Sequence, residues 1–303
     1  MVRRFLVPAI CAAVASIAAA PSPSPSPAPS PSASPAASPS ASPAAAASPS
    51  PVPLPYTAAP ADPARGSALL KKAVAAHGGA AAIDGVRTVE LTGTSGRTMG
   101  GQDPIVMPSH THIVMPNLYR NELMTQAGPI ATLLNHEGAY VLLNGGALPL
   151  PEAEGAALRA TANRNLLTLL RTHDAAELRV ARVGSARLPE GEVEMVEFQL
   201  AGQKTVLGID SASGLVRQSI YEMPVGGAMG QVVATYSDYR PLSNGVRYPF
   251  RSAGTVDGKP VFTSRLEKVV VNGAIDESLF ALPSPPPAPS EPLPWASPSP
   301  SGQ

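Results

Sequence analysis

The sequence is short of cysteine, of aromatic residues and of any excess charge. Cys11 is the single cysteine and lies in an apolar N-terminal segment, so the rest of the chain offers no disulfide, no reactive thiolate and no cysteine-based metal site. The 22 basic and 22 acidic residues give a formal net charge of zero, and aromatic residues make up 4% of the chain. Without a basic surface or interleaved aromatic residues, we exclude nucleic acid as a partner.

Motifs for familiar catalytic chemistry are also missing. The chain has neither the Gly-x-Ser-x-Gly turn of serine hydrolases nor the His-Glu-x-x-His motif of zinc proteases. His110 and His112 share one face of an expected strand, but two imidazoles are too few for a metal site. We therefore expect no enzyme, no catalytic residue, no metal and no cofactor. A secreted enzyme with an unrecognised site remains a separate hypothesis.

Composition divides the chain into four segments. Residues 1–20 combine two arginines with an apolar, alanine-rich run, which is typical of a secretory signal peptide and predicts a periplasmic or secreted protein. The alternative is an uncleaved inner-membrane anchor, although the run is short and Pro8 interrupts it. Residues 21–62 are almost entirely Pro, Ser and Ala, and residues 283–303 are rich in Pro, so both are expected to be disordered. The folded domain is expected to span residues 63–282.

Two helices are expected from apolar spacing. The first covers residues 66–77, with Ser67 as a candidate cap and Gly78 after its end. The second covers residues 152–170, with Pro151 at its entry and an apolar stripe along one face.

The rest of the domain has the alternation and turn residues of antiparallel strands. Two well-marked turns are Asn244-Gly245 and Asp257-Gly258. The expected strands cover residues 86–93, 109–115, 118–125, 130–135, 139–143, 177–186, 193–201, 205–210, 215–221, 231–239, 247–255 and 261–271. We predict an α+β fold, mostly antiparallel β: an unclosed half β-barrel of about 11–12 strands with two helices covering its concave face.

Two helices of this length leave part of such a concave face uncovered, which predicts a hydrophobic cavity for an apolar ligand. The candidate cavity residues are apolar positions on the expected strands: Ile113, Met115, Leu133, Tyr140, Leu142, Phe198, Leu200 and Phe262. The candidate lid residues are apolar positions on the two helices: Leu70, Val74, Leu158, Leu166 and Leu169.

Three segments resemble the LolA-like family of periplasmic outer-membrane lipoprotein carriers and lipoprotein-sorting proteins. Residues 114–123 (VMPNLYRNEL), followed by Thr125-Gln126, are similar to the family's Pro-Asn-Leu-aromatic turn and Thr-Gln segment. Residues 136–144 (HEGAYVLLN) are similar to its next hairpin, and residues 236–283 to the C-terminal end of many relatives. The order of these motifs agrees over roughly residues 65–283.

The resemblance implies an unclosed β-barrel with a helical lid, whose apolar hollow holds the acyl chains of a lipoprotein or another lipid. We expect a non-enzymatic carrier that is a monomer and that has lipid, and in addition envelope proteins, as its partners. Carriers of that family place an arginine before Pro-Asn-Leu, where it fastens the lid, and this chain has Met115 there. The alternative function is an envelope sensor or scaffold on the same fold, with no bound lipid, acting through protein–protein contacts.

Overall fold

The computed structural model describes residues 55–98, 103–225 and 228–283. The expected signal peptide, most of the expected linker and the tail from residue 284 onward lie outside the described residues. The strands are β1 (Thr57–Asp62), β2 (Thr88–Arg97), β3 (Ile105–Val114), β4 (Leu118–Thr125), β5 (Gly128–Leu134), β6 (Ala139–Leu143), β7 (Gly146–Pro149), β8 (Arg179–Leu188), β9 (Gly191–Leu200), β10 (Gln203–Asp210), β11 (Val216–Val225), β12 (Ala228–Pro241), β13 (Arg247–Val256) and β14 (Lys259–Val271). The helices are α1 (Pro63–Ala76), α2 (Ala80–Asp84), α3 (Glu152–Asn163), α4 (Leu166–Leu170) and the short 3-10 helix η2 (Glu277–Phe280).

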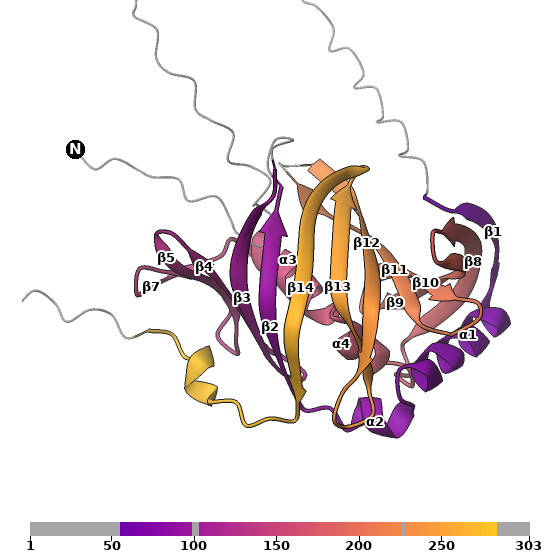
Figure 1. Cartoon of the computed structure of the whole chain (residues 1–303), viewed down its shortest axis with the longest axis horizontal. Helices are drawn as coiled ribbons and strands as arrows, with labels where there is room; N and C mark the ends of the chain where they lie inside the picture. Colours follow the sequence, from indigo (N-terminus) through magenta and orange to yellow (C-terminus); the bar gives the residue numbers. More distant parts are fainter. Residues whose placement is uncertain (1–54, 99–102, 226–227, 284–303) are drawn as a thin grey trace, which may run out of the picture.

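The 14 strands form one antiparallel sheet in the order β1-β8-β9-β10-β11-β12-β13-β14-β2-β3-β4-β5-β6-β7 (Figure 1). Nearly all neighbouring strands are consecutive in sequence. The exceptions are β1, which pairs with β8, and β14, which pairs with β2 and so joins the two halves of the sheet. The edge strands β1 and β7 are not neighbours, so the sheet curves without closing into a barrel. The predicted fold class, an unclosed half-barrel with covering helices, is confirmed.

Two strands were not predicted, and one of them moves a domain boundary. The strand β1 lies within the segment expected to be a disordered linker, and it pairs with β8 through Thr57 and Ser185. The strand β7 is a four-residue strand that pairs with β6. Both contain proline, which is tolerated at the edge of a sheet, where one side of the strand needs no hydrogen-bonded partner.

The first helix begins earlier than its apolar spacing predicts. Asp62, not Ser67, caps α1, because its Oδ1 accepts a hydrogen bond from the backbone N–H of Arg65 at 2.9 Å. Pro63 occupies the first turn, where its fixed φ suits a helix and no N–H is needed. The end is as expected, since Gly78 follows the helix with φ of 115°.

The predicted helix over residues 152–170 is divided into two. Asn165 has an extended ψ of 132° and its side chain accepts a hydrogen bond from the backbone N–H of Leu167 at 3.1 Å. An asparagine that caps a new helix ends the previous one, because the two roles need different backbone angles. The helices α3 and α4 are therefore separate and not collinear, as they would be in one continuous helix.

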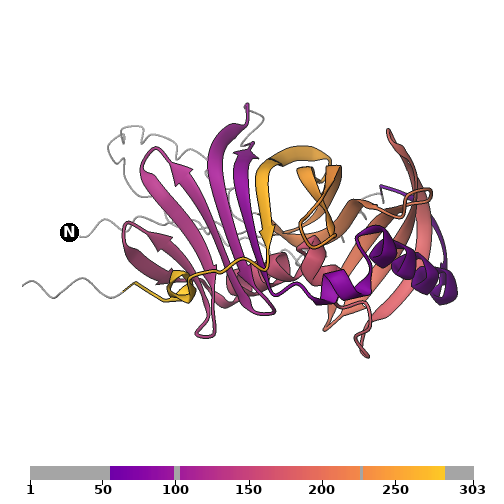
Figure 2. The same ribbon diagram turned by 60° about the horizontal axis from the view of Figure 1, so that its bottom comes forward.

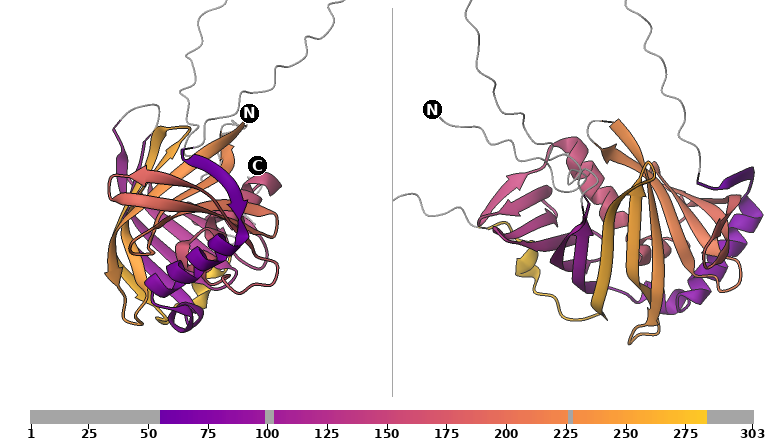
Figure 3. Two further views of the ribbon diagram at one scale, coloured as in Figure 1. Left: turned by 90° about the vertical axis from the view of Figure 1, so that its right-hand side faces the viewer. Right: turned by 45° about the horizontal axis from the view of Figure 1, so that its top comes forward.

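The helices lie on the concave side of the sheet, around which the strands curl (Figure 2; Figure 3, left). The main core joins α1, α2 and α4 to the inward faces of the strands; its largest fully buried members are Phe198, Ile83, Leu167, Leu170, Leu207 and Ile209. The helix α3 packs separately against β5 and β6, where Leu158 and Ala162 contact Leu134 and Ala139. Within the described residues, no helix has the length and apolar character to cross a membrane.

The C-terminal segment, residues 272–283, covers the face of β4, β5 and β6 that is opposite to α3. Arg120 Nη1 donates to the Leu279 carbonyl at 2.9 Å, and Asn135 Nδ2 donates to the Phe280 carbonyl at 2.9 Å. Phe280 is itself buried. This segment passes below β4 and β5 in Figure 1 and closes a surface that the helices do not reach.

Candidate functional site

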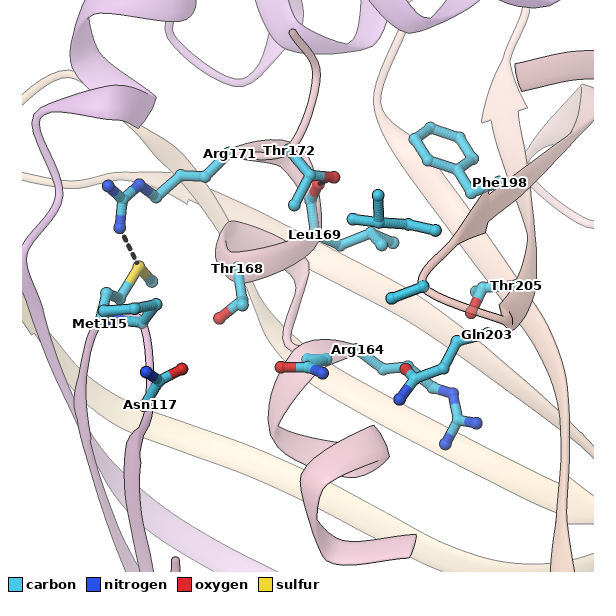
Figure 4. Close-up of a pocket in the computed structure, with 14 residues that line it drawn as sticks. Met115, Asn117, Arg164, Thr168, Leu169, Arg171, Thr172, Phe198, Gln203 and Thr205 are labelled. Carbon is cyan, nitrogen blue, oxygen red and sulfur yellow. Dashed lines mark hydrogen bonds between the residues drawn. The ribbon is translucent and has the colours of Figure 1, made fainter. Parts of the chain in front are cut away.

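A cavity of about 360 Å³ lies between the lid helices and the concave face of the sheet, and we call it the lid pocket. Three parts of the chain build it: the turn between β3 and β4, the segment from the end of α3 through α4, and the hairpin between β9 and β10 (Figure 4). The lining residues are Met115, Pro116, Asn117, Asn163, Arg164, Thr168, Leu169, Arg171, Thr172, Phe198, Leu200, Ala201, Gln203 and Thr205.

Four predicted residues meet in this pocket. Met115 comes from the β3–β4 turn, Leu169 from α4, and Phe198 and Leu200 from β9. Phe198 is 2% exposed and belongs to the core beneath the pocket, whereas the other three are only partly buried. Partly exposed apolar side chains around a hollow are what a hydrophobic ligand would cover.

Three other cavity candidates lie on the wrong face of the sheet. Leu133 pairs with Tyr140, and both share their face with Leu142, which pairs with Ala131. Arg120 pairs with Leu133 on that same face and contacts the C-terminal segment. The prediction that these residues line the concave hollow is therefore incorrect, because they lie under the C-terminal segment instead.

Ile113 and Phe262 lie outside the lid pocket for different reasons. Ile113 faces the concave side but is 3% exposed and packed into the main core. Phe262 is near one end of β14, where it pairs with Arg97 and the guanidinium carbon of that arginine lies 5.7 Å from the ring centroid. Neither side chain reaches the cavity.

The predicted lid residues are placed mostly as core. Leu70 and Val74 of α1, Leu166 of α4 and Leu158 of α3 are all less than 9% exposed. Only Leu169 lines the lid pocket. The apolar stripes of the helices thus attach them to the sheet and leave one leucine facing the hollow.

Side-chain contacts hold α4 over the sheet. Asn165 Nδ2 donates to the Tyr248 hydroxyl at 3.1 Å, and burial raises the pKa of Tyr248 to about 12. On the other side, Arg171 Nη1 donates to Met115 Sδ at 2.9 Å (Figure 4). The resemblance implied a lid-fastening arginine at position 115; here the cation comes from the lid, and position 115 supplies a sulfur, which is a weak acceptor.

Arg164 lines the side of the pocket opposite Met115 and Arg171 (Figure 4). Its guanidinium carbon lies 4.2 Å from the centroid of the Tyr221 ring, and Nη2 donates a long hydrogen bond of 3.4 Å to the Glu222 carbonyl. Burial lowers the pKa of Arg164, and the interaction with Tyr221 opposes that shift. The pocket therefore combines apolar walls with a partly desolvated cation.

The histidine pair does not form a metal site in the part of the chain that the structure describes. The rings of His110 and His112 are 6.2 Å apart and edge to face. No group of three or more His, Cys, Asp or Glu side chains among the described residues is arranged to hold a metal ion.

Reasoning from the sequence missed the polar residues of the pocket, above all Arg164, Thr168, Arg171 and Gln203. One signal was available for the two arginines, because each follows the last residue of a helix, where the dipole favours a cation. That signal predicts a positive charge at the end of each helix, but it does not predict where the arginine side chain points. For Arg164, that direction follows from the helix break at Asn165.

No protein-family model matches this chain, and no curated protein matches it in sequence. Solved structures do match. One is an outer-membrane lipoprotein-sorting protein domain from Vibrio parahaemolyticus, with 12% identity, a TM-score of 0.48, and coverage of 72% of this chain and 97% of that one. Another is a LolA superfamily protein from Nitrosomonas europaea, with 10% identity, a TM-score of 0.47, and coverage of 71% and 97%. LprF from Mycobacterium bovis matches with 11% identity, a TM-score of 0.28, and coverage of 71% and 97%.

The chain is thus similar to LolA superfamily and lipoprotein-sorting structures, the family that the sequence motifs resemble. At such low identities and TM-scores, these likenesses assign neither a ligand nor a function to this chain.

Proposed function

We propose that this chain is an exported, non-enzymatic binder of an apolar ligand, such as the acyl chain of a lipid or lipoprotein, and that the ligand occupies the lid pocket. The observation that carries the proposal is the partly exposed apolar lining of a hollow between a lid and a sheet. Met115, Leu169 and Leu200 come from three separate elements and face one cavity.

The size of the cavity supports this role. Its volume of about 360 Å³ lies at the lower end of the range for small-molecule sites, roughly 300–1,000 Å³. Each methylene group of a ligand that leaves water contributes about 0.8 kcal/mol. A single alkyl chain, partly buried, is therefore the class of ligand that this pocket suits.

The chemistry of the lining supports binding over catalysis. Its polar members are asparagine, glutamine, threonine and arginine, and none of the described lining residues is a carboxylate, an imidazole or a thiol. General acid–base catalysis relies mainly on such groups.

The finer parts of the proposal rest on the sequence. The apolar segment at residues 1–20 supports export to the periplasm or beyond, and the motif resemblance supports lipoprotein acyl chains as the ligand and envelope proteins as partners. We propose a monomer.

One observation favours the second candidate, a sensor or scaffold without lipid. Much of the space between α4 and the sheet is filled by a continuous core of buried side chains, including Leu167, Leu170 and Leu207, and the lid pocket lies beside this core. A protein that used the same fold only as a rigid platform would need no larger cavity.

Purification of the full chain from a bacterial periplasm, followed by native mass spectrometry and lipid extraction, distinguishes the two. We expect a co-purifying lipid that is lost in Leu200→Glu, because a carboxylate in the pocket wall opposes burial of an alkyl chain. The matched control is Leu148→Glu, at a residue 48% exposed on β7 and outside the pocket, which should keep the lipid. Protein that arrives empty and takes up no fluorescent fatty acid would refute lipid binding and favour the scaffold.

A further inference from the structure

Arg164 is a partly buried cation with few partners. Its guanidinium stacks on Tyr221 and makes one long hydrogen bond to a carbonyl oxygen, while its buried Nε has no hydrogen-bond partner. Among the described residues, no carboxylate forms an ion pair with it; Glu222 meets it only through the backbone. Burial of a charged group is unfavourable unless the group is paired, so this site is electrostatically incomplete.

The whole lid pocket shares this excess of positive charge. Its lining contains two arginines, Arg164 and Arg171, and no Asp or Glu, in a chain whose formal net charge is zero. Arg171 donates to Met115 Sδ, a weak acceptor that leaves its charge uncompensated. Elsewhere on the domain several arginines pair with acids, as Arg182 does with Glu194 at 2.9 Å.

The position of Arg164 at a helix end does not account for its burial. Both pocket arginines directly follow a helix, and a cation there is favoured by the helix dipole. An arginine on solvent would gain the same interaction without losing hydration. The side chain instead lines both the lid pocket and a neighbouring cavity of about 500 Å³. That second cavity also includes Gln203 and Tyr221, together with one cation, Lys204, and one carboxylate, Glu222.

We propose that the ligand is an anionic amphiphile: its alkyl chain lies in the lid pocket and its oxyanion headgroup, a carboxylate or a phosphate, binds Arg164 at the junction of the two cavities. The inference rests on the proposed function and adds the class of headgroup. Gln203 lines both cavities beside the junction and offers an amide N–H to the same oxygens. Arginine matches carboxylate and phosphate oxygens with two parallel N–H donors, which gives the site its preference for oxyanions.

Displacement of the neutral fluorophore N-phenylnaphthylamine from the full chain, stripped of lipid, tests the inference. The competitors share a dodecyl chain and differ in the headgroup: dodecanoate, dodecyl phosphate, dodecanol and dodecyltrimethylammonium. We expect both anions to bind about tenfold or more tightly than dodecanol, which corresponds to the usual strength of one charged hydrogen-bonded contact, and the cation to bind most weakly. The ratio of carboxylate to phosphate affinity tells which oxyanion the site prefers.

Variants separate the headgroup from the chain. Arg164→Met should bring the ratio of dodecanoate to dodecanol affinity close to one, and a cooperative urea transition like that of the natural chain shows that the variant is folded. Arg164→Lys should retain part of the preference. The control is Arg159→Met, at an exposed arginine one turn earlier on α3 and outside the pocket, which should behave like the natural chain.

The outcomes distinguish the two proposals. Equal binding of anions and dodecanol by the natural chain, or an anion preference that survives in Arg164→Met, would overturn the headgroup assignment and leave alkyl-chain binding standing. Displacement by inorganic phosphate as effectively as by dodecyl phosphate would also overturn it, because the site would then be one for a free anion. Failure of the fluorophore and every competitor to bind would overturn both proposals.

Discussion

Acidification should destabilise this protein through His77, the residue that follows α1. Its side chain is fully buried, and its Nδ1 lies 2.8 Å from the Ala73 carbonyl, which makes Nδ1 the protonated nitrogen of a neutral ring. Nε2 is buried without a hydrogen-bond partner among the described residues. The imidazole and Tyr239 rings are edge to face, with their centroids 5.5 Å apart. Burial, helped by the charges of Arg217 and Arg247, lowers the pKa of His77 to about 4, although the hydrogen bond to Ala73 opposes this shift.

The sign and size follow from linkage. The unfolded chain takes up the proton near its ordinary pKa of 6.5, whereas the folded chain resists it until about pH 4. The contribution of neutral His77 is therefore fully present above pH 6.5 and is lost as the pH falls toward 4. The difference between a pKa of 6.5 and one of about 4, at about 1.4 kcal/mol per pH unit, corresponds to a loss of about 3 kcal/mol in the free energy of unfolding between pH 7 and pH 4.

Urea unfolding of the natural chain and of His77→Gln at pH 7 and pH 4 measures this contribution. Glutamine has no proton to gain in this range, so the stability difference between the two proteins should change by about 3 kcal/mol, which is a shift of about 1 M or more in the urea midpoint. Carboxylates that lose their ion pairs at low pH affect both proteins equally. The control His136→Gln, on an exposed turn, should follow the natural chain. An identical pH dependence in His77→Gln and the natural chain would refute the reasoning.

Three further substitutions test local features of the fold by urea unfolding. Asp62→Ala should cost about 1 kcal/mol, because it removes the cap of α1, whereas Ser67→Ala should change stability by less than about 0.5 kcal/mol; the reverse order would restore Ser67 as the cap. Asn165→Ala should cost about 1–3 kcal/mol, since it removes both the cap of α4 and the hydrogen bond to β13, and an unchanged midpoint would contradict these contacts. Gly254→Ala should cost about 1–3 kcal/mol, because the new Cβ would lie 2.0 Å from the Phe262 ring, and a neutral result would show that the ring moves freely.

The sequence was a good guide wherever structure is local. Turns such as Asp257-Gly258 carry residues that accept positive φ, with observed values of 48° and 78°, so the hairpins and most strands were placed correctly. The strands β1 and β7 were missed because their residues have little β propensity, and only their pairing with β8 and β6 makes them strands. Such pairing is a tertiary property that no window of the sequence contains.

The site shows a different limit. Alternation correctly groups Leu133, Tyr140 and Leu142 on one face, but it does not tell which face is concave. That choice depends on which face α3 and the C-terminal segment each cover, and the C-terminal segment is distant in sequence from these strands. Two of the four predicted residues that line the pocket, Met115 and Leu200, lie at strand ends beside a turn, close to the lid.

The break at Asn165 connects the fold to the proposed function. In a continuous helix over residues 152–170, the helical repeat alone would set the direction of the Arg164 side chain, at about 100° around the axis from each neighbouring residue. Because the chain turns at Asn165, Arg164 directly follows the last residue of α3, and its side chain extends toward the β9–β10 hairpin (Figure 4). The same asparagine that caps α4 and bonds to Tyr248 thus also sets the direction of the proposed anion-binding arginine. Lid stability and headgroup preference are therefore coupled through one residue. We expect Asn165→Ala to weaken dodecanoate binding more than dodecanol binding in the displacement assay. An equal loss for both ligands would show that Arg164 is positioned independently of the helix break.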